Sequence, residues 1–228
     1  MASQFLNFVK GVRYRLRLGR EATTLFYDLN AFHYRKAIFV HVPKTGGVSV
    51  STAVYKGLSG GHKTVNFYRE FFGHDTYDKY FSFTFVRQPE DRFLSAVNFL
   101  LSGGMSKEDK KWADLFSKES FDLNEFVLTE LAEQVSNKKH FFTQRQFLVD
   151  ENGTVNVNFI GKYENLLPDF KIVARRIGIK DNLPHLNNSP CKSFDRSDLN
   201  REALHKIYCL YAQDYQLGDY QPLYQSFS

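Results

Sequence analysis

A lysine, two glycines and several hydroxyl residues gather in one short stretch, VPKTGGVSV, at residues 42–50. The stretch follows an apolar run and leads into small residues that suit the start of a helix. Backbone amides at a helix N-terminus attract anions, and glycine lets the backbone approach a ligand closely. Lys44 adds a positive charge, and Thr45 and Ser49 add hydroxyl donors. This combination predicts a loop that binds a phosphate-like anion.

The order of these residues differs from that of a nucleoside-triphosphate loop. In that loop the lysine follows the last glycine and is next to the hydroxyl residue that binds magnesium. Here Lys44 precedes both Gly46 and Gly47. Taken alone, the stretch is equally compatible with an ordinary glycine turn between a strand and a helix.

A second stretch, FTFVRQPEDRFLSAV at residues 83–97, offers a matching basic group. Arg87 ends an apolar run, and Ser95 lies about two helical turns further on. Open α/β sheets bind ligands at the carboxyl ends of their strands, and arginine is a two-pronged donor for phosphate. The alternatives are a structural salt bridge for Arg87 and an exposed helix position for Ser95.

Histidines are the candidates for a general base, because their pKa near neutrality suits proton removal from an alcohol. The chain has seven: His33, His41, His62, His74, His140, His185 and His205. His62 lies between the two stretches and is the first candidate, and His74 is the second. We expect His41 to pack at a strand end. Any of the seven also fits an ordinary surface or packed position.

The elements that position these residues alternate along the chain. Strands are expected at 36–42 and 81–87, with a weaker one at 157–161. Helices are expected at 48–57, 89–101, 108–117, 121–135, 164–178 and 197–213. This alternation predicts an α/β fold with a central, mostly parallel sheet flanked by helices. With no linker in view, we expect a single domain over 1–228, in which 102–150 form a helical lid or side wall.

Taken together, the two stretches resemble the sulfotransferases that use PAPS (3′-phosphoadenosine-5′-phosphosulfate). HVPKTGGVSV is similar to the 5′-phosphosulfate loop of that family, and FTFVRQPEDRFLSAV to its 3′-phosphate motif. Three later pieces resemble the carbohydrate branch, or family 2: VNFIGKYENLLPDF (157–170), NLPHLNNSP (182–190) and YCLYAQDYQLGDY (208–220). The departures are Val48, Gln88 and Val97, where threonine, asparagine and tyrosine are usual.

The resemblance implies a P-loop-like three-layer fold and transfer of a sulfuryl group from PAPS to a hydroxyl, without a metal. The product is adenosine 3′,5′-bisphosphate. Lys44 then stabilises the leaving oxygen, Arg87 and Ser95 bind the 3′-phosphate, and His62 matches a family histidine. The resemblance also implies that the 5′-phosphate is bound by Thr45, Gly46, Gly47, Val48 and Ser49. Lys192 is expected at the 3′-phosphate or the substrate, and His140 and Gln144 are expected to line the acceptor cleft.

The expected acceptor is a carbohydrate, ahead of a glycolipid, a small alcohol or a peptide tyrosine. One alternative is a P-loop-type small-molecule kinase, which the position of Lys44 disfavours. Another is a non-catalytic module that binds polyanions through residues 1–20, which hold five basic and no acidic residues. That segment has the spacing of a basic amphipathic helix, either docked on the body or in contact with a membrane surface or an anionic polymer.

The rest of the chain is neutral, since its 25 basic residues balance 25 acidic ones among totals of 30 and 25. A neutral body without a basic and aromatic stripe argues against nucleic-acid binding. No stretch has the length of a membrane span or the pattern of a signal peptide. Cys191 and Cys209 form no metal or redox pattern. We therefore expect a cytoplasmic protein of bacterial type.

Overall fold

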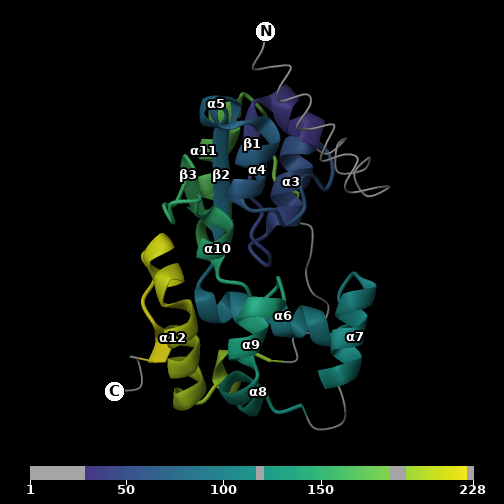
Figure 1. The fold of residues 1–228 in the computed structure, drawn as a ribbon, viewed down its shortest axis with the longest axis vertical. Coiled ribbons are helices and arrows are strands. Elements are labelled where there is room, and N and C mark those ends of the chain that lie inside the picture. Colours follow the sequence, from purple (N-terminus) through teal and green to yellow (C-terminus); the bar gives the residue numbers. More distant parts are fainter. Residues whose placement is uncertain (1–28, 117–120, 185–193, 225–228) are drawn as a thin grey trace. The chain divides into compact units, whose positions relative to one another are not determined.

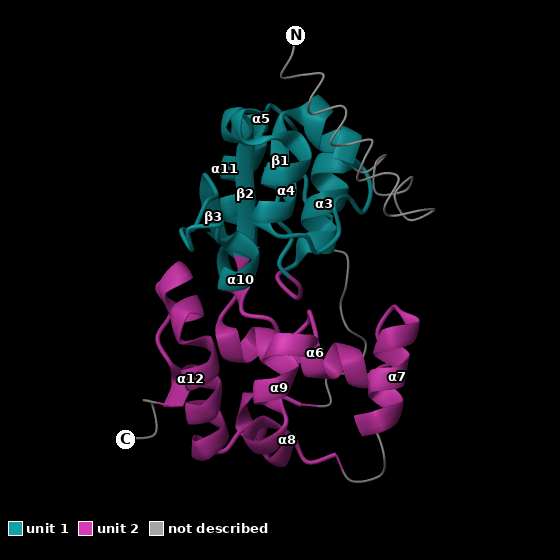
Figure 2. Ribbon diagram, viewed as in Figure 1, with its two compact units in different colours: residues 1–42, 46–85, 145–186 teal, residues 43–45, 86–144, 187–228 magenta. Residues whose placement is uncertain are grey.

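The computed structural model describes residues 29–116, 121–184 and 194–224. The expected basic helix at 1–20 and the candidate Lys192 lie outside these residues. The chain forms two compact units, each built from separate segments (Figure 2). Unit 1 consists of residues 1–42, 46–85 and 145–186, and unit 2 of residues 43–45, 86–144 and 187–228. The assignment of the whole chain to one domain stays a prediction.

Unit 1 contains a three-stranded sheet in the order β1 (Ala37–Phe39), β2 (Phe81–Val86), β3 (Phe159–Lys162). β1 and β2 pair in parallel, with Ala37 opposite Phe81 and Phe39 opposite Phe83. The rings of Phe39 and Phe83 are fully buried and stack at 5.1 Å between centroids. The predicted α/β fold, with a parallel sheet flanked by helices, is confirmed (Figure 1).

Helices account for the rest of the regular structure in unit 1, after a helical segment at 29–35. Their bounds are α3 (Gly47–Tyr55), α4 (Val65–Phe72), α5 (His74–Lys79), α10 (Gln144–Leu148), η1 (Tyr163–Asn165) and α11 (Leu166–Ile177). α3 and α11 correspond to helices expected from the sequence, whereas α4 and α5 were not expected. Gly73, at φ 83°, ends α4 and begins α5, so the two helices are too short for a clear helical period.

Unit 2 is helical, with α6 (Pro89–Leu101), α7 (Lys107–Phe116), α8 (Leu123–Thr129), α9 (Leu131–Asn137), η2 (Arg196–Asp198) and α12 (Arg201–Leu217). Its core joins α6, α8, α9 and α12 through buried side chains that include Phe93, Phe126 and Phe141. The single helix expected at 121–135 is in fact two, because Glu130 ends α8 and begins α9. The stretch from 102 to 150 is largely helical where it is described, and its role as a lid stays a prediction.

Within the described residues, no helix is both long enough and apolar enough to cross a membrane.

Candidate functional site

The glycine turn before α3 has the backbone that an anion loop needs. Gly46 takes φ 79°, a left-handed conformation that glycine adopts without strain, and its carbonyl accepts the Ser49 amide at 3.1 Å. A Cβ on Gly46 would lie 3.1 Å from side-chain atoms of Tyr163 and Leu166. α3 begins at the next residue and has no acidic side chain in its first turn. The positive end of this helix therefore carries no carboxylate of its own that would repel a bound anion.

Gly47 is required for a different reason. A Cβ on this residue would lie 2.0 Å from Nε2 of His41, so the histidine ring occupies the place of a side chain. That ring is 8% exposed and stacks on Phe39 at 5.2 Å. The expectation that His41 packs at the strand end agrees with this position. The ring leaves room only for glycine at the start of α3.

His62 lies beside His41, with 4.3 Å between the ring centroids. Its Nδ1 is 2.9 Å from the main-chain carbonyl oxygen of His41. Because a carbonyl oxygen only accepts, Nδ1 carries the proton and donates it. In the neutral ring Nε2 is then the acceptor nitrogen, which is the tautomer that a general base acting through Nε2 requires.

In unit 2, Lys44 and Arg87 are in direct contact. Nη1 of Arg87 donates to the Lys44 carbonyl at 3.3 Å. Nζ of Lys44 lies 4.0 Å from the centre of the Phe99 ring in α6. Burial first, and then the charge of Arg87, lower the pKa of Lys44 to about 8, against an opposing effect of Asp109. The structure thus brings together the two basic residues that the sequence assigned to opposite ends of one donor.

The backbone of Lys44 is itself unusual. It takes φ 69°, a left-handed conformation that is uncommon for a residue with a side chain. Such strain persists only where the surrounding structure imposes it, and it concentrates at functional sites. The strained lysine, the αL glycine and the start of α3 follow one another within residues 44–47.

The hydroxyl candidates differ in exposure. Thr45 is fully buried and Ser49 is 5% exposed, whereas Ser95 is half-buried on α6. Ser95 precedes Phe99 by four positions, so both lie on the same face of α6. Val48 is half-buried as well. The loop thus keeps two hydroxyls inside the protein, where a hydrogen-bond partner is worth most.

His74, the second candidate base, lies elsewhere in unit 1. Its side chain is 54% exposed, and its Nδ1 is 3.9 Å from the Glu151 carboxylate. Nη2 of Arg69 donates to Nδ1 at 2.9 Å, and Nη1 of Arg69 also donates to Asp78. In the neutral ring of His74 the proton is therefore on Nε2, opposite to the arrangement in His62.

The third family-like stretch, 157–170, builds the turn that packs against Gly46. A Cβ on Gly161 would lie 2.5 Å from the Phe85 ring, so glycine lets β3 approach β2. One carboxylate oxygen of Asp169 accepts the Lys162 amide at 2.7 Å, and the other accepts the Asn165 side chain at 2.7 Å. These bonds shape the chain that carries Tyr163 and Leu166. In the described structure this stretch therefore packs against the loop.

Gln144 was expected to line the acceptor cleft, and this expectation is wrong because Gln144 is fully buried. Its side-chain amide instead binds the main chain of Arg87. The sequence carried no local signal for this contact, which joins residues 57 positions apart. The side chain of His140 is 15% exposed and lies beside Asp109 at 3.7 Å.

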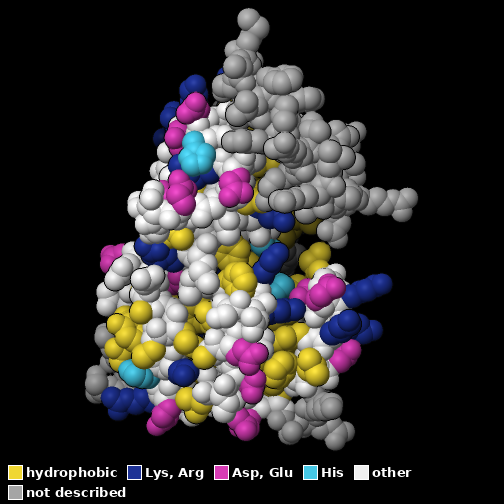
Figure 3. Space-filling model, in the orientation of Figure 1, with side chains coloured by type: hydrophobic (Ala, Val, Ile, Leu, Met, Phe, Trp, Pro, Cys, Tyr) yellow, Lys and Arg dark blue, Asp and Glu magenta, His cyan; other side chains and the backbone are white. Residues whose placement is uncertain are grey.

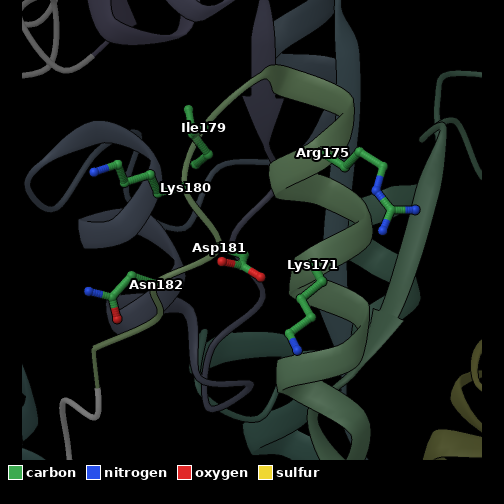
Figure 4. A pocket seen from close by; sticks show the side chains of 6 residues that line it. All are labelled: Lys171, Arg175, Ile179, Lys180, Asp181 and Asn182. Carbon is green, nitrogen blue, oxygen red and sulfur yellow. The ribbon is translucent and has the colours of Figure 1, made fainter.

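A separate pocket on unit 1 is lined by residues of α11 and the segment after it, namely Lys171, Arg175, Ile179, Lys180, Asp181 and Asn182 (Figure 4). Arg175 and Lys180 point in different directions, and Asp181 lies between the basic residues. The basic groups therefore do not converge on one point. Among the described residues, no three His, Cys, Asp or Glu side chains are grouped as metal ligands would be.

Comparison with known proteins identifies a family for the chain. A model of the sulfotransferase family, in its family 2, matches residues 28–221. The chain therefore belongs to the sulfotransferase family and is an enzyme of sulfuryl transfer. The comparisons with curated proteins and with solved structures found no match.

Proposed function

We propose that this enzyme transfers the sulfuryl group of PAPS to a hydroxyl group of a carbohydrate. The observation that carries the proposal is the contact of the Arg87 guanidinium with the main chain of Lys44, directly before the αL glycine and the start of α3. PAPS carries anionic groups on both sides of its ribose, and it supplies an activated sulfuryl group. The two predicted anion-binding stretches suit these two ends.

The first stretch receives the 5′ end of the donor. The residues from Thr45 to Ser49 offer the first-turn amides of α3 and two hydroxyls to the 5′-phosphate. Lys44 provides the positive charge that stabilises the oxygen on which negative charge develops as the sulfuryl group leaves. Catalysis of this kind rests on positioning and electrostatics, as in phosphoryl transfer.

The second stretch receives the 3′-phosphate. Arg87 contributes a guanidinium that matches the geometry of phosphate oxygens, and Ser95 contributes a hydroxyl. Lys192, outside the described residues, is proposed for the 3′-phosphate or the substrate. A nucleotide without the 3′-phosphate leaves the guanidinium of Arg87 without its anion, so these residues would discriminate PAPS from simpler adenine nucleotides.

His62 is proposed as the general base that takes the acceptor proton. Its Nδ1 donates to the His41 carbonyl, so its Nε2 is the nitrogen able to accept a proton. His74 is the weaker candidate because Arg69 donates to its Nδ1 within a surface ionic cluster. The hydrogen bond to the main-chain carbonyl of His41 fixes the orientation of the His62 ring. In a catalytic triad the third residue orients the base in the same way.

A carbohydrate acceptor is proposed because the later stretches resemble the carbohydrate branch of the family. On the face shown in Figure 3, basic and acidic side chains of the described residues are interspersed. That mixture does not favour a polyanion-binding surface on this face. Contact of the segment 1–20 with a membrane surface stays a proposal that rests on its charge pattern alone.

Calorimetry with adenosine 3′,5′-bisphosphate tests the donor site. We expect Arg87→Ala to weaken binding by about 2–4 kcal/mol, because a charged hydrogen-bond partner is lost. An unchanged affinity would remove Arg87 from the site. Transfer of radiolabelled sulfate from PAPS to a panel of saccharides then tests the acceptor, and the same assay in EDTA should keep its rate. Phosphate transfer from ATP that EDTA abolishes would instead favour a magnesium-dependent kinase.

A further inference from the structure

The side-chain amide of Gln144 forms hydrogen bonds with both the amide and the carbonyl of the Arg87 main chain. Its Oε1 accepts the Arg87 amide at 2.9 Å, and its Nε2 donates to the Arg87 carbonyl at 2.8 Å. Gln144 is fully buried, so water does not compete for these bonds. A primary amide has the same donor and acceptor as a peptide group. The Gln144 side chain therefore bonds to Arg87 as the main chain of a neighbouring β-strand would. Arg87 is thereby held immediately after the last residue of β2.

The segment that leads to Gln144 is tied down by a buried arginine from α6. Arg92 is fully buried. Its Nη1 donates to the carbonyl of His140 at 3.1 Å, and its Nη2 donates to the carbonyl of Phe142 at 2.6 Å. These charge-assisted bonds fix two of the last carbonyls before Gln144.

Two further ties come from α12, within the stretch 208–220. The hydroxyl of Tyr211 donates to the carbonyl of Phe141 at 2.7 Å. The carboxylate of Asp214, also fully buried, accepts the main-chain amide of Gln144 at 2.7 Å. Buried side chains from two helices therefore hold three successive carbonyls and then the Gln144 amide. The last residue of this set is Gln144, which binds the main chain of Arg87.

We propose that Gln144 is a positioning residue that sets the direction of the Arg87 side chain and so determines the selectivity for a 3′-phosphorylated nucleotide. The inference rests on the proposed function, in which Arg87 binds the 3′-phosphate. The main chain of a residue sets the direction of its Cα–Cβ bond. Gln144 binds both main-chain groups of Arg87 and so fixes the position from which the Arg87 side chain extends. The Nη1 of that side chain donates to the Lys44 carbonyl.

The test compares two ligands, adenosine 3′,5′-bisphosphate and adenosine 5′-phosphate, by calorimetry. The ratio of their affinities isolates the contribution of the 3′-phosphate. We expect Gln144→Met, which keeps the length of the side chain but removes both bonds, to lower this ratio by about tenfold or more. Gln144→Glu keeps the size and an acceptor, and the ionised form places an oxygen against the Arg87 carbonyl, so it should lower the ratio as well.

Asn158→Ala is the matched control. Asn158 also uses its side chain to bind the main chain of β2, but at the other end of the strand, where its Oδ1 accepts the Ser82 amide at 2.8 Å. This variant should keep the affinity ratio of the wild type. A ratio lowered equally by Asn158→Ala, or a Gln144→Met variant that weakens both ligands by one common factor, would show a general structural effect and overturn the inference.

Two further outcomes separate the inference from the proposed function. A wild type that binds both nucleotides equally would refute the 3′-phosphate site itself and the inference with it. A wild type that discriminates, together with Gln144 variants that discriminate as well, would refute the inference alone. Should neither Gln144 variant fold, hydrogen exchange on the wild type decides. We expect the Arg87 amide to be protected without nucleotide, and rapid exchange there would overturn the proposal.

Discussion

The lowered pKa of Lys44 predicts that the proposed nucleotide binding depends on pH in a defined window. Burial and the charge of Arg87 bring the pKa of this lysine to about 8 in the protein without nucleotide. A bound phosphate dianion favours the charged form and raises the pKa of Lys44 again. The two states therefore differ in protonation above pH 8, and binding there must take up a proton.

The size and sign of the effect follow from that pKa. Below pH 8 the free protein already carries the charged lysine, so the affinity for adenosine 3′,5′-bisphosphate is at its full value. Above pH 8 only the protonated fraction binds well, and the affinity falls about tenfold for each pH unit until the pKa of the bound state is reached. Between pH 7 and pH 9 we expect a loss of about tenfold, or about 1.4 kcal/mol.

Calorimetry at several pH values, in buffers of different ionisation enthalpy, measures both the affinity and the protons taken up. The window starts at pH 7 because the second ionisation of the phosphates lies near pH 6. Lys44→Arg is the control, since arginine stays charged throughout and its profile should be flat. An affinity of the wild type that stays constant from pH 7 to pH 9 would refute this account of Lys44. A loss of equal size in Lys44→Arg would assign the titration to another group.

Two more substitutions test the loop and the base. His62→Ala should leave the affinity for adenosine 3′,5′-bisphosphate unchanged and abolish sulfate transfer, and a fully active variant would move the base elsewhere, with His74 next. Gly47→Ala should displace the loop at an overpacking cost of about 1–3 kcal/mol, because its Cβ meets the His41 ring, and should thereby weaken nucleotide binding. The double variant with His41→Ala should regain much of that affinity, and calorimetry on all three proteins would expose a Gly47 effect that does not depend on His41.

Local signals predicted the elements that carry Arg87 and Ser95. α6 spans Pro89–Leu101, the same residues as the predicted helix, because proline at its first position and two acidic residues mark the start clearly. The apolar run before Arg87 likewise marked β2. The approach of Arg87 to Lys44 followed from the rule that parallel strands present their carboxyl ends at one edge of a sheet.

What the sequence did not reveal is the support around Arg87. Glu90 is one of the two first-turn acids of α6, and it is also fully buried and accepts the Leu223 amide at 3.0 Å. Gln144 and Arg92 bind main-chain groups far away in sequence. Every residue type carries the same main-chain groups, so the sequence does not indicate which residue provides the partner. Patterns of apolar spacing and turn residues report local structure, so contacts of this kind become visible only when the chain is folded.

His41 contacts both the glycine turn and the proposed base, His62. Its carbonyl receives the Nδ1 proton of His62, and its ring fills the space next to Gly47. The first contact belongs to the main chain and would survive a change of side chain, whereas the second depends on the ring. The orientation of His62 and the shape of the glycine turn are therefore linked through one residue yet chemically separable. A larger residue at position 47 accordingly requires a smaller side chain at position 41, while the orientation of the proposed base is kept by the backbone.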